Sequence, residues 1–160
     1  MIKALIIGCG KIAGNNELGN LNTHAGAYSN LDNVKIVGCI DKDHNKAKNF
    51  SEQYNCPAEN DIELCLKKYI PDVVSVCSSD NTHFEITKKI LNSNNPPKVI
   101  FLEKPICHSK TELDILIDLS LKKNVDVVVN FTRRFDQNYI TMRDRILDNY
   151  YGILRNVYAT

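Results

Sequence analysis

The sequence predicts an open, doubly wound parallel α/β sheet. Five short apolar runs recur along the chain, each bounded by turn residues, at 2–7, 34–40, 73–77, 98–102 and 125–130. Continuous runs of this length are typical of strands buried on both faces, as in parallel sheets. Segments with helical spacing separate the runs, and a chain that alternates strand with helix places its ligand at the carboxyl ends of the strands.

The helices are predicted from their start signals. Asp43 can cap one helix, Asp80 or Asn81 can cap a second, and Ser109 with Glu112 forms a capping box for a third. Each is expected to turn one apolar face to the sheet. These faces comprise Ala47, Phe50 and Tyr54; Phe84, Thr87 and Leu91; and Leu113, Leu116, Ile117 and Leu121. A further helix is expected over 137–148.

Composition limits the class of protein. With 160 residues, 43% of them hydrophobic, the chain can bury one well-packed core. The net charge is +1 and the lysines are dispersed, so no basic stripe for a nucleic acid is expected. The apolar N-terminal run is too short for a membrane span and shows no signal-peptide pattern. We therefore expect a cytoplasmic protein with neither nucleic acid nor membrane as partner.

The six cysteines are scattered and form no C-x-x-C pair, so a metal site is not expected. Most lie in or beside apolar runs, where a free thiol behaves as a small buried hydrophobe in a reducing compartment.

A glycine-rich turn follows the first apolar run. Its sequence, Gly8-Cys9-Gly10-Lys11-Ile12-Ala13, matches the G-x-G-x-x-A fingerprint of the dinucleotide-binding Rossmann fold. Gly8 would permit the tight turn and Gly10 would let the backbone approach a pyrophosphate, while Ala13 would let a helix pack closely on the strand. Lys11 and Ile12 are then expected beside the phosphates at a helix N-terminus. The alternative is a glycine turn without a ligand.

Asp41 ends the second run, where its carboxylate can accept both hydrogen bonds of an adenosine ribose diol. That carboxylate repels a 2′-phosphate, which favours NAD. NADP stays open, because Lys42 follows and because the interval from Gly8 exceeds the usual ~20 residues. The extra residues, 14–23, predict a Gly/Asn-rich loop before or within the first helix, either beside the substrate or solvated.

Polar residues also follow the run at 73–77. Ser78, Ser79, Asn81 and His83 suit the ribose and phosphates of a cofactor, and helix capping is an alternative compatible with that role. A structural role is favoured for His83, and His24 at the start of the first helix is favoured as a cap or packing residue over a catalyst.

The run at 98–102 leads into Glu103-Lys104-Pro105, and this motif resembles the glucose-fructose oxidoreductase and inositol dehydrogenase family, Gfo/Idh/MocA. The resemblance covers essentially all of the chain through ordered matches: the glycine turn, Asp41, the segment 78–83, Glu103-Lys104-Pro105 and Arg133-Arg134-Phe135.

The resemblance implies roles for these residues. Lys104 would hydrogen-bond the reacting hydroxyl and the nicotinamide ribose, Glu103 would orient Lys104, and Pro105 would fix the turn, often through a cis peptide in this family. The alternative for Lys104 is a surface lysine in a loop that enters a helix. Arg133 and Arg134 would contact an anionic or polyhydroxyl substrate or, slightly favoured, brace the interface between domains.

The resemblance also implies an NAD(P)-dependent dehydrogenase that transfers hydride between nicotinamide and a secondary alcohol of a sugar, cyclitol or nucleotide-sugar. Residues 1–150 would form the Rossmann domain. Residues 151–160 would begin a second α/β domain, which supplies the substrate pocket, the catalytic acid/base and a homo-oligomer interface. The chain would then be a fragment that binds cofactor without turning over substrate. Reduction of a non-sugar substrate by a related enzyme, or a non-catalytic NAD(P)-sensing module, are the alternatives.

Overall fold

The computed structural model describes residues 1–156 and 158 of the chain. In this part, six parallel strands form one sheet in the order β3-β2-β1-β4-β5-β6. The strands are β1 (Ile2–Ile7), β2 (Val34–Ile40), β3 (Ala58–Glu59), β4 (Val73–Val76), β5 (Val99–Leu102) and β6 (Asp126–Val129). All five predicted runs form strands, which confirms the predicted fold class. The two-residue strand β3 has no apolar run of its own and was not predicted.

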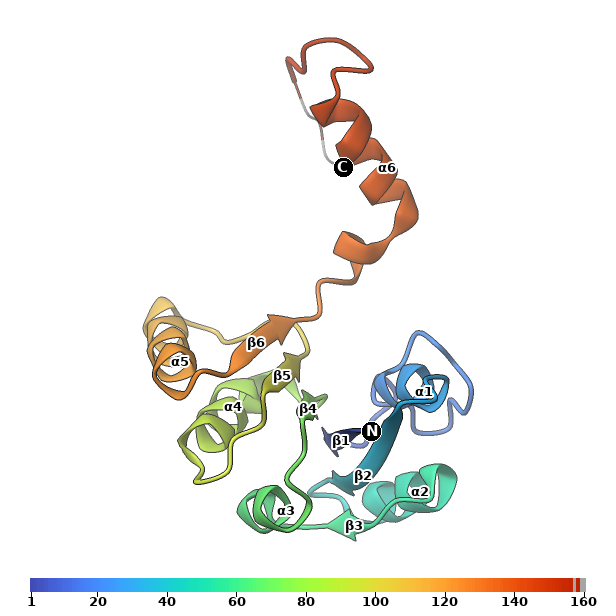
Figure 1. Cartoon of the computed structure of the whole chain (residues 1–160), viewed down its shortest axis with the longest axis vertical. Coiled ribbons are helices and arrows are strands. Elements are labelled where there is room, and N and C mark those ends of the chain that lie inside the picture. Colours follow the sequence, from blue (N-terminus) through green and yellow to red (C-terminus); the bar gives the residue numbers. More distant parts are fainter. Residues whose placement is uncertain (157, 159–160) are drawn as a thin grey trace. The chain divides into compact units, whose positions relative to one another are not determined.

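Helices cover both faces of the sheet (Figure 1). The helices α1 (His24–Ser29) and α2 (His44–Tyr54) lie on one face, and α3 (Ile62–Tyr69), α4 (His83–Asn92) and α5 (Lys110–Lys123) lie on the other. A short 3-10 helix, η1 (Asp80–Thr82), precedes α4. The connection after β1 leads to β2 on one side, and the connection after β4 leads to β5 on the other side. The boundary between β1 and β4 is therefore the topological switch point of the sheet.

Each face of the sheet has its own buried core. Leu5, Val74 and Ile100 pack with the helices α3 to α5, and Leu116 of α5 belongs to the same cluster. On the other face a smaller cluster surrounds the fully buried Phe50 of α2. Burial of alternate residues on both faces explains why the central strands read as continuous apolar runs.

The prediction of a helix directly after the glycine turn is wrong. Residues 11–16 form successive turns and α1 begins only at His24, so the loop predicted over 14–23 precedes the helix. Gly14 and Asn16 have positive φ angles of 120° and 59°, which an α-helix does not accommodate. The loop is held instead by side chains of α2, because the Tyr54 hydroxyl and the Gln53 amide donate to the Gly14 carbonyl at 2.8 Å.

Capping predictions have mixed outcomes. The Asp43 side chain accepts the backbone N–H groups of Asn45 and Lys46, and the capping box of Ser109 and Glu112 is present. No side-chain cap forms at α4, whose N-terminal flank is η1, so the cap expected from Asp80 or Asn81 is wrong. The 3-10 turn supplies its own backbone hydrogen bonds before the α-helix begins.

Two burial predictions at the sheet edge are also wrong. In α5 Leu116 is buried, but Ile117 and Leu121 are exposed, because the helix packs through the side that carries Leu116 and Leu119. Strand β6 is the last of the described sheet, and Val128 on it is 42% exposed. An edge strand has a neighbour on one side only, so it is not buried on both faces.

The chain divides into two compact units, Met1–Asn130 and Phe131–Thr160. The second unit contains the 3-10 helix η2 (Thr132–Phe135) and the predicted helix, α6 (Gln137–Leu147), which Asp136 caps. Of the strand expected over 152–160, residues 157 and 159–160 lie outside the described residues, and the rest have irregular backbone. The domain boundary near residue 150 and that strand stay predictions.

The cysteines are free thiols and most are buried, as predicted from the apolar runs in or beside which they lie. Five are buried, namely Cys9, Cys39, Cys56, Cys65 and Cys77, whereas Cys107 is partly exposed. The described residues hold no cluster suited to a metal ion. They also include no helix that is both long and apolar enough to cross a membrane.

Candidate functional site

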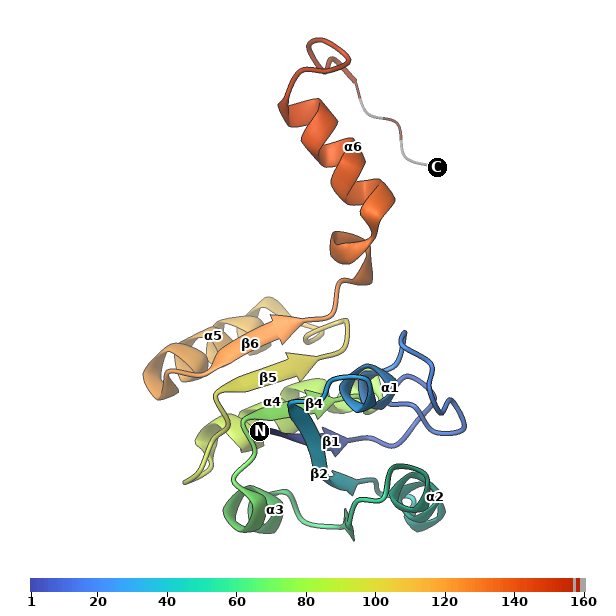
Figure 2. The ribbon, with the colours of Figure 1, turned by 45° about the vertical axis from the view of Figure 1, so that its right-hand side comes forward.

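The carboxyl ends of the parallel strands meet at one edge of the sheet, where the arrowheads of β4, β5 and β6 point the same way (Figure 2). A cavity of about 710 Å³ opens at this edge beside the switch point. Its walls come from the ends of β1 and β2, from residues that follow β1, β2, β3 and β4, and from the N-terminal parts of α2, α3 and α4. Seven predicted site residues line it: Gly8, Gly10, Asp41, Lys42, Ser78, Ser79 and Asn81.

The two glycines of the turn fit a bound dinucleotide in different ways. Gly8 has φ +90°, and a Cβ atom there would lie 2.5 Å from the Ser78 backbone nitrogen. Gly8 therefore lets the turn after β1 pack directly on the turn after β4. A Cβ on Gly10 would meet nothing within 4 Å, and Gly10 lines the cavity. Its backbone is thus open to the approach of a phosphate group.

Asp41 is fixed at the tip of β2. Its Oδ2 atom accepts the Cys9 backbone N–H at 2.7 Å, and its Oδ1 atom accepts the Asp43 N–H at 2.8 Å. Each carboxylate oxygen can accept a second hydrogen bond, so Asp41 retains capacity for a ribose diol. Lys42 and Lys46 line the same cavity, which adds positive charge close to this carboxylate.

The segment after β4 presents hydroxyl and amide groups to the cavity. Ser78, Ser79, Asn81 and Thr82 all line it. The Thr82 hydroxyl lies 2.8 Å from the Ser78 hydroxyl oxygen and 2.7 Å from the Ser79 carbonyl oxygen. These contacts order the segment from within, which leaves the exposed Ser79 side chain free for a ligand.

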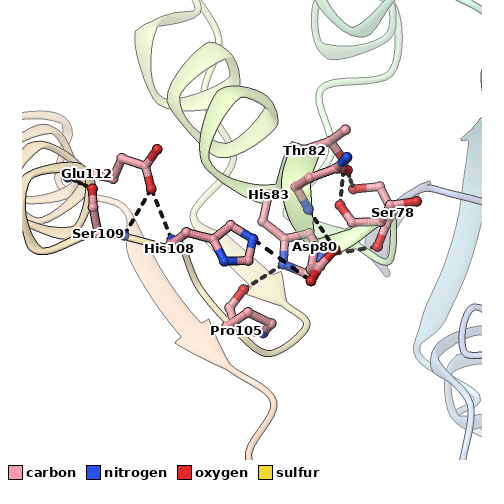
Figure 3. Close-up of polar contacts among 10 residues, drawn as sticks. Ser78, Asp80, Thr82, His83, Pro105, His108, Ser109 and Glu112 are labelled. Carbon is pink, nitrogen blue, oxygen red and sulfur yellow. Dashed lines mark hydrogen bonds and ion pairs between the residues drawn. The ribbon is translucent and has the colours of Figure 1, made fainter.

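His83 does not line the cavity, and its side chain is buried between Ser78 and Pro105 (Figure 3). Its Nδ1 atom lies 2.6 Å from the Pro105 carbonyl oxygen, and its Nε2 atom lies 3.0 Å from the Ser78 carbonyl oxygen. The ring therefore joins the turn after β4 to the turn after β5. Nearby, His108 lies 3.8 Å from the Asp80 carboxylate and adds a second link between the two turns. This placement supports the structural role favoured for His83.

The motif Glu103-Lys104-Pro105 follows β5 directly, with a cis peptide bond between Lys104 and Pro105. Lys104 is exposed, whereas the Glu103 carboxylate is buried and receives hydrogen bonds from His24 at 3.0 Å and Asn130 at 2.6 Å. Burial alone raises the pKa of Glu103, but the hydrogen bonds from His24 and Asn130 bring it below its usual range. Glu103 is therefore a carboxylate at neutral pH.

Four further predicted residues are not among those that line the cavity. Lys11 is largely exposed and pairs with Glu17 at 3.4 Å, and Ile12 is 39% exposed. Arg133 and Arg134 belong to η2 in the second unit, where Arg133 lies over the Tyr139 ring. Their roles toward phosphate, substrate or interface stay predictions.

Sequence reasoning missed Lys46, Asn60 and Lys89, which line the cavity, and it did not predict the contact between His24 and Glu103. Lys46 was detectable, because it falls in the first turn of a helix that Asp43 caps beside Asp41. Asn60 follows a strand too short to be predicted. The contact between His24 and Glu103 joins residues far apart in sequence, so local patterns carry no signal for it.

Comparison with known proteins identifies the kind of domain. The profile described as "Oxidoreductase family, NAD-binding Rossmann fold" matches residues 2–131. The chain is 26% identical over 160 residues to D-glucoside 3-dehydrogenase of Escherichia coli K12, covering 99% of this chain and 42% of that protein. It is 27% identical over 131 residues to myo-inositol 2-dehydrogenase of Thermotoga maritima, covering 81% of this chain and 38% of that protein.

A solved structure shows the same fold. The crystal structure of a putative myo-inositol dehydrogenase from Sinorhizobium meliloti 1021 superposes with a TM-score of 0.80 at 22% identity. The match covers 95% of this chain and 43% of that one. The chain thus spans about two fifths of the length of these relatives.

Proposed function

The chain belongs to the Gfo/Idh/MocA oxidoreductase family with an NAD-binding Rossmann fold, and from this we propose that it is the cofactor domain of a sugar or cyclitol dehydrogenase. The observation that carries the proposal is a single cavity at the switch point of the sheet, which the glycine turn, Asp41 and the segment 78–82 line together. In doubly wound sheets a dinucleotide binds at this place.

Different residues of the cavity would contact different parts of the cofactor. The backbone at Gly10 and the hydroxyl of Ser78 or Ser79 would hold the pyrophosphate, and Asp41 would hold the adenosine ribose. When bound, the nicotinamide supplies a hydride acceptor for alcohol oxidation or a donor for the reverse reaction. Lys104, exposed after β5, would donate a hydrogen bond to the substrate hydroxyl and stabilise the developing alkoxide.

The substrate class is proposed from the relatives. Two of them are named for oxidation of a glucoside and of myo-inositol, both of which carry secondary alcohols. A non-catalytic NAD(P)-sensing module is the alternative. The exposed Lys104 disfavours it, because cofactor binding alone requires no lysine at that position. We also propose that a second domain of the whole protein supplies the catalytic acid/base and the oligomer interface.

Preference for NAD over NADP is expected to depend on Asp41. We expect the wild-type chain to bind NADH more tightly than NADPH, with a limited difference because Lys42 and Lys46 flank the carboxylate. Asp41→Ala removes a charged hydrogen-bond acceptor worth about 1.5–3 kcal/mol, so NADH affinity should fall by at least about tenfold. NADPH affinity should fall less or rise, since the repulsion of a 2′-phosphate is also removed.

Titration of the chain with NADH and NADPH, followed by nicotinamide fluorescence, measures these affinities. Asp32→Ala, in the exposed turn before β2, is the matched control and should bind like the wild type. A wild-type chain that binds neither dinucleotide saturably would refute the proposed cofactor site.

A further inference from the structure

A buried row of polar side chains leads from α1 to the carboxyl end of β5. Tyr28 lies one turn after His24 on α1, and its hydroxyl is 2.8 Å from the Ser75 hydroxyl on β4. The Ser75 hydroxyl is 3.0 Å from Nδ1 of His24, and Nε2 of His24 is 3.0 Å from Oε1 of Glu103. The His24 side chain is only 2% exposed. None of these four residues is among those that line the cavity.

One protonation pattern gives every hydrogen atom of this row an acceptor. Because Glu103 is a carboxylate, Nε2 of His24 carries the hydrogen of that contact. Nδ1 then accepts from the Ser75 hydroxyl, whose oxygen accepts from Tyr28. A second hydrogen on Nδ1 would turn the Ser75 hydroxyl toward the Tyr28 oxygen and leave the hydroxyl hydrogen of Tyr28 without an acceptor among the described contacts. The row therefore selects the neutral histidine that is protonated on Nε2.

The same row fixes the start of the Glu103-Lys104-Pro105 turn. The Glu103 backbone N–H donates to the Val76 carbonyl at 3.0 Å, which ties the turn to β4. The side chain of Asn130, just after β6, donates to the carboxylate at 2.6 Å. His24 supplies the second side-chain donor to the same oxygen, so Glu103 is held by α1, β4 and the end of β6. The backbone of Lys104 leaves from this fixed point.

We propose that His24 is a positioning residue, which in its neutral, Nε2-protonated form holds Glu103 and thereby sets where Lys104 leaves the sheet. Tyr28 and Ser75 keep His24 in that form. The relevance of this arrangement to a substrate hydroxyl rests on the proposed function, whereas the arrangement itself is a property of the chain without ligand.

The groups that face His24 are few. Its titratable contact is the carboxylate of Glu103, and the phenol of Tyr28 is linked to it through the Ser75 hydroxyl. The Phe101 ring packs 4.8 Å from the His24 ring. Cys77, after β4, is close enough for the charge on Glu103 to act on it. Desolvation first, and then that charge, raise the pKa of the Cys77 thiol well above its usual range. Cys77 therefore adds no charge near His24 at neutral pH.

Nuclear magnetic resonance of the 160-residue chain tests the proposal directly. The ring ¹⁵N spectrum of His24 at neutral pH should show one protonated nitrogen, Nε2. Amide hydrogen exchange then compares the wild type with His24→Leu, which removes the donor, and with His24→Gln, whose amide retains one. Thr87→Val is the control, because Thr87 is equally buried and its hydroxyl has no hydrogen-bond partner.

In His24→Leu the amides of Glu103 and Lys104 should exchange on the order of tenfold faster, because a buried carboxylate has lost a donor. Exchange in His24→Gln and Thr87→Val should stay close to that of the wild type. A doubly protonated or Nδ1-protonated His24, or unchanged exchange in a folded His24→Leu variant, would overturn the proposal. NADH titration of the same samples reports separately on the proposed function, since that function can fail while the exchange result holds.

Discussion

At Gly8 the protein's own packing requires a glycine, whereas at Gly10 the space beyond the backbone belongs to the cavity. The positive φ of Gly8 and the nearby backbone of Cys77 and Ser78 leave no room for a side chain. At the same scale, Glu103 owes its charged state to two donors that come from other elements of the fold. Close backbone packing at Gly8 therefore determines the residue type of the turn, and the two donors determine the charge of the buried carboxylate.

Gly8→Ala is expected to lower the free energy of unfolding by about 3 kcal/mol, because it combines a strained φ with a steric overlap on rigid backbone. Gly19→Ala is the matched comparison, since Gly19 has φ +77° but no atom within 4 Å of its added Cβ. It should cost only about 1 kcal/mol of strain. Urea unfolding of both variants measures the difference, and equal losses would contradict the packing argument.

The lowered pKa of Glu103 predicts a loss of stability in acid. Its contribution is fully present above the unfolded-state pKa, about 4.5, and is lost as the pH falls through the lower pKa of the folded state. The stability difference between the wild type and Glu103→Gln should therefore shrink as the pH falls from 6 through this range. Urea unfolding at a series of pH values tests this, with the exposed Glu52→Gln as control. A difference that is independent of pH would contradict it.

At the scale of elements, local signals worked where the side chain acts within its own segment. The capping box of α5 and the Asp43 cap of α2 are examples. The helices α2, α3 and α5 also end in the left-handed conformation, at Asn55, Ile70 and Asn124. Asparagine adopts that backbone conformation with little strain, whereas a β-branched isoleucine adopts it only with steric strain. The end of α3 therefore stores strain in an exposed residue.

Ile70→Gly should raise the free energy of unfolding by about 1 kcal/mol. The substitution relieves the left-handed strain, and it sacrifices little burial because Ile70 is 60% exposed. Thermal or urea unfolding checks the gain. Asn55→Gly, at the equivalent position of α2, should change stability by only a few tenths of a kcal/mol. A loss of stability in Ile70→Gly would show that its partly exposed side chain contributes more than the strain costs.

At the scale of the whole molecule, the sheet order brings distant segments to one edge. Gly8, Asp41 and Ser78 line one cavity because β1, β2 and β4 are adjacent and parallel. The cavity thus exists only in the folded chain, and a ligand that occupies it must stabilise the fold.

NADH at a hundred times its dissociation constant should stabilise the chain by about 2.7 kcal/mol through mass action. The melting temperature, followed by circular dichroism at increasing NADH, measures this effect. At the same NADH concentration the shift should be smaller in Asp41→Ala. An NADH concentration series that leaves the melting temperature unchanged would mean that the folded chain has no preferential site.

The sequence by itself determined the alternation of strands and helices, the glycine turn, the acidic tip of β2 and the Glu103-Lys104-Pro105 motif. Each of these features depends only on residues that are close together in the sequence. The sequence did not reveal β3, whose two residues are too few for a periodic signal, or the displaced start of α1, which side chains of α2 hold in place. Only the tertiary structure decided that His24 contacts Glu103 and that His83 joins two turns. These contacts depend on which strands are adjacent, and long-range packing sets that adjacency.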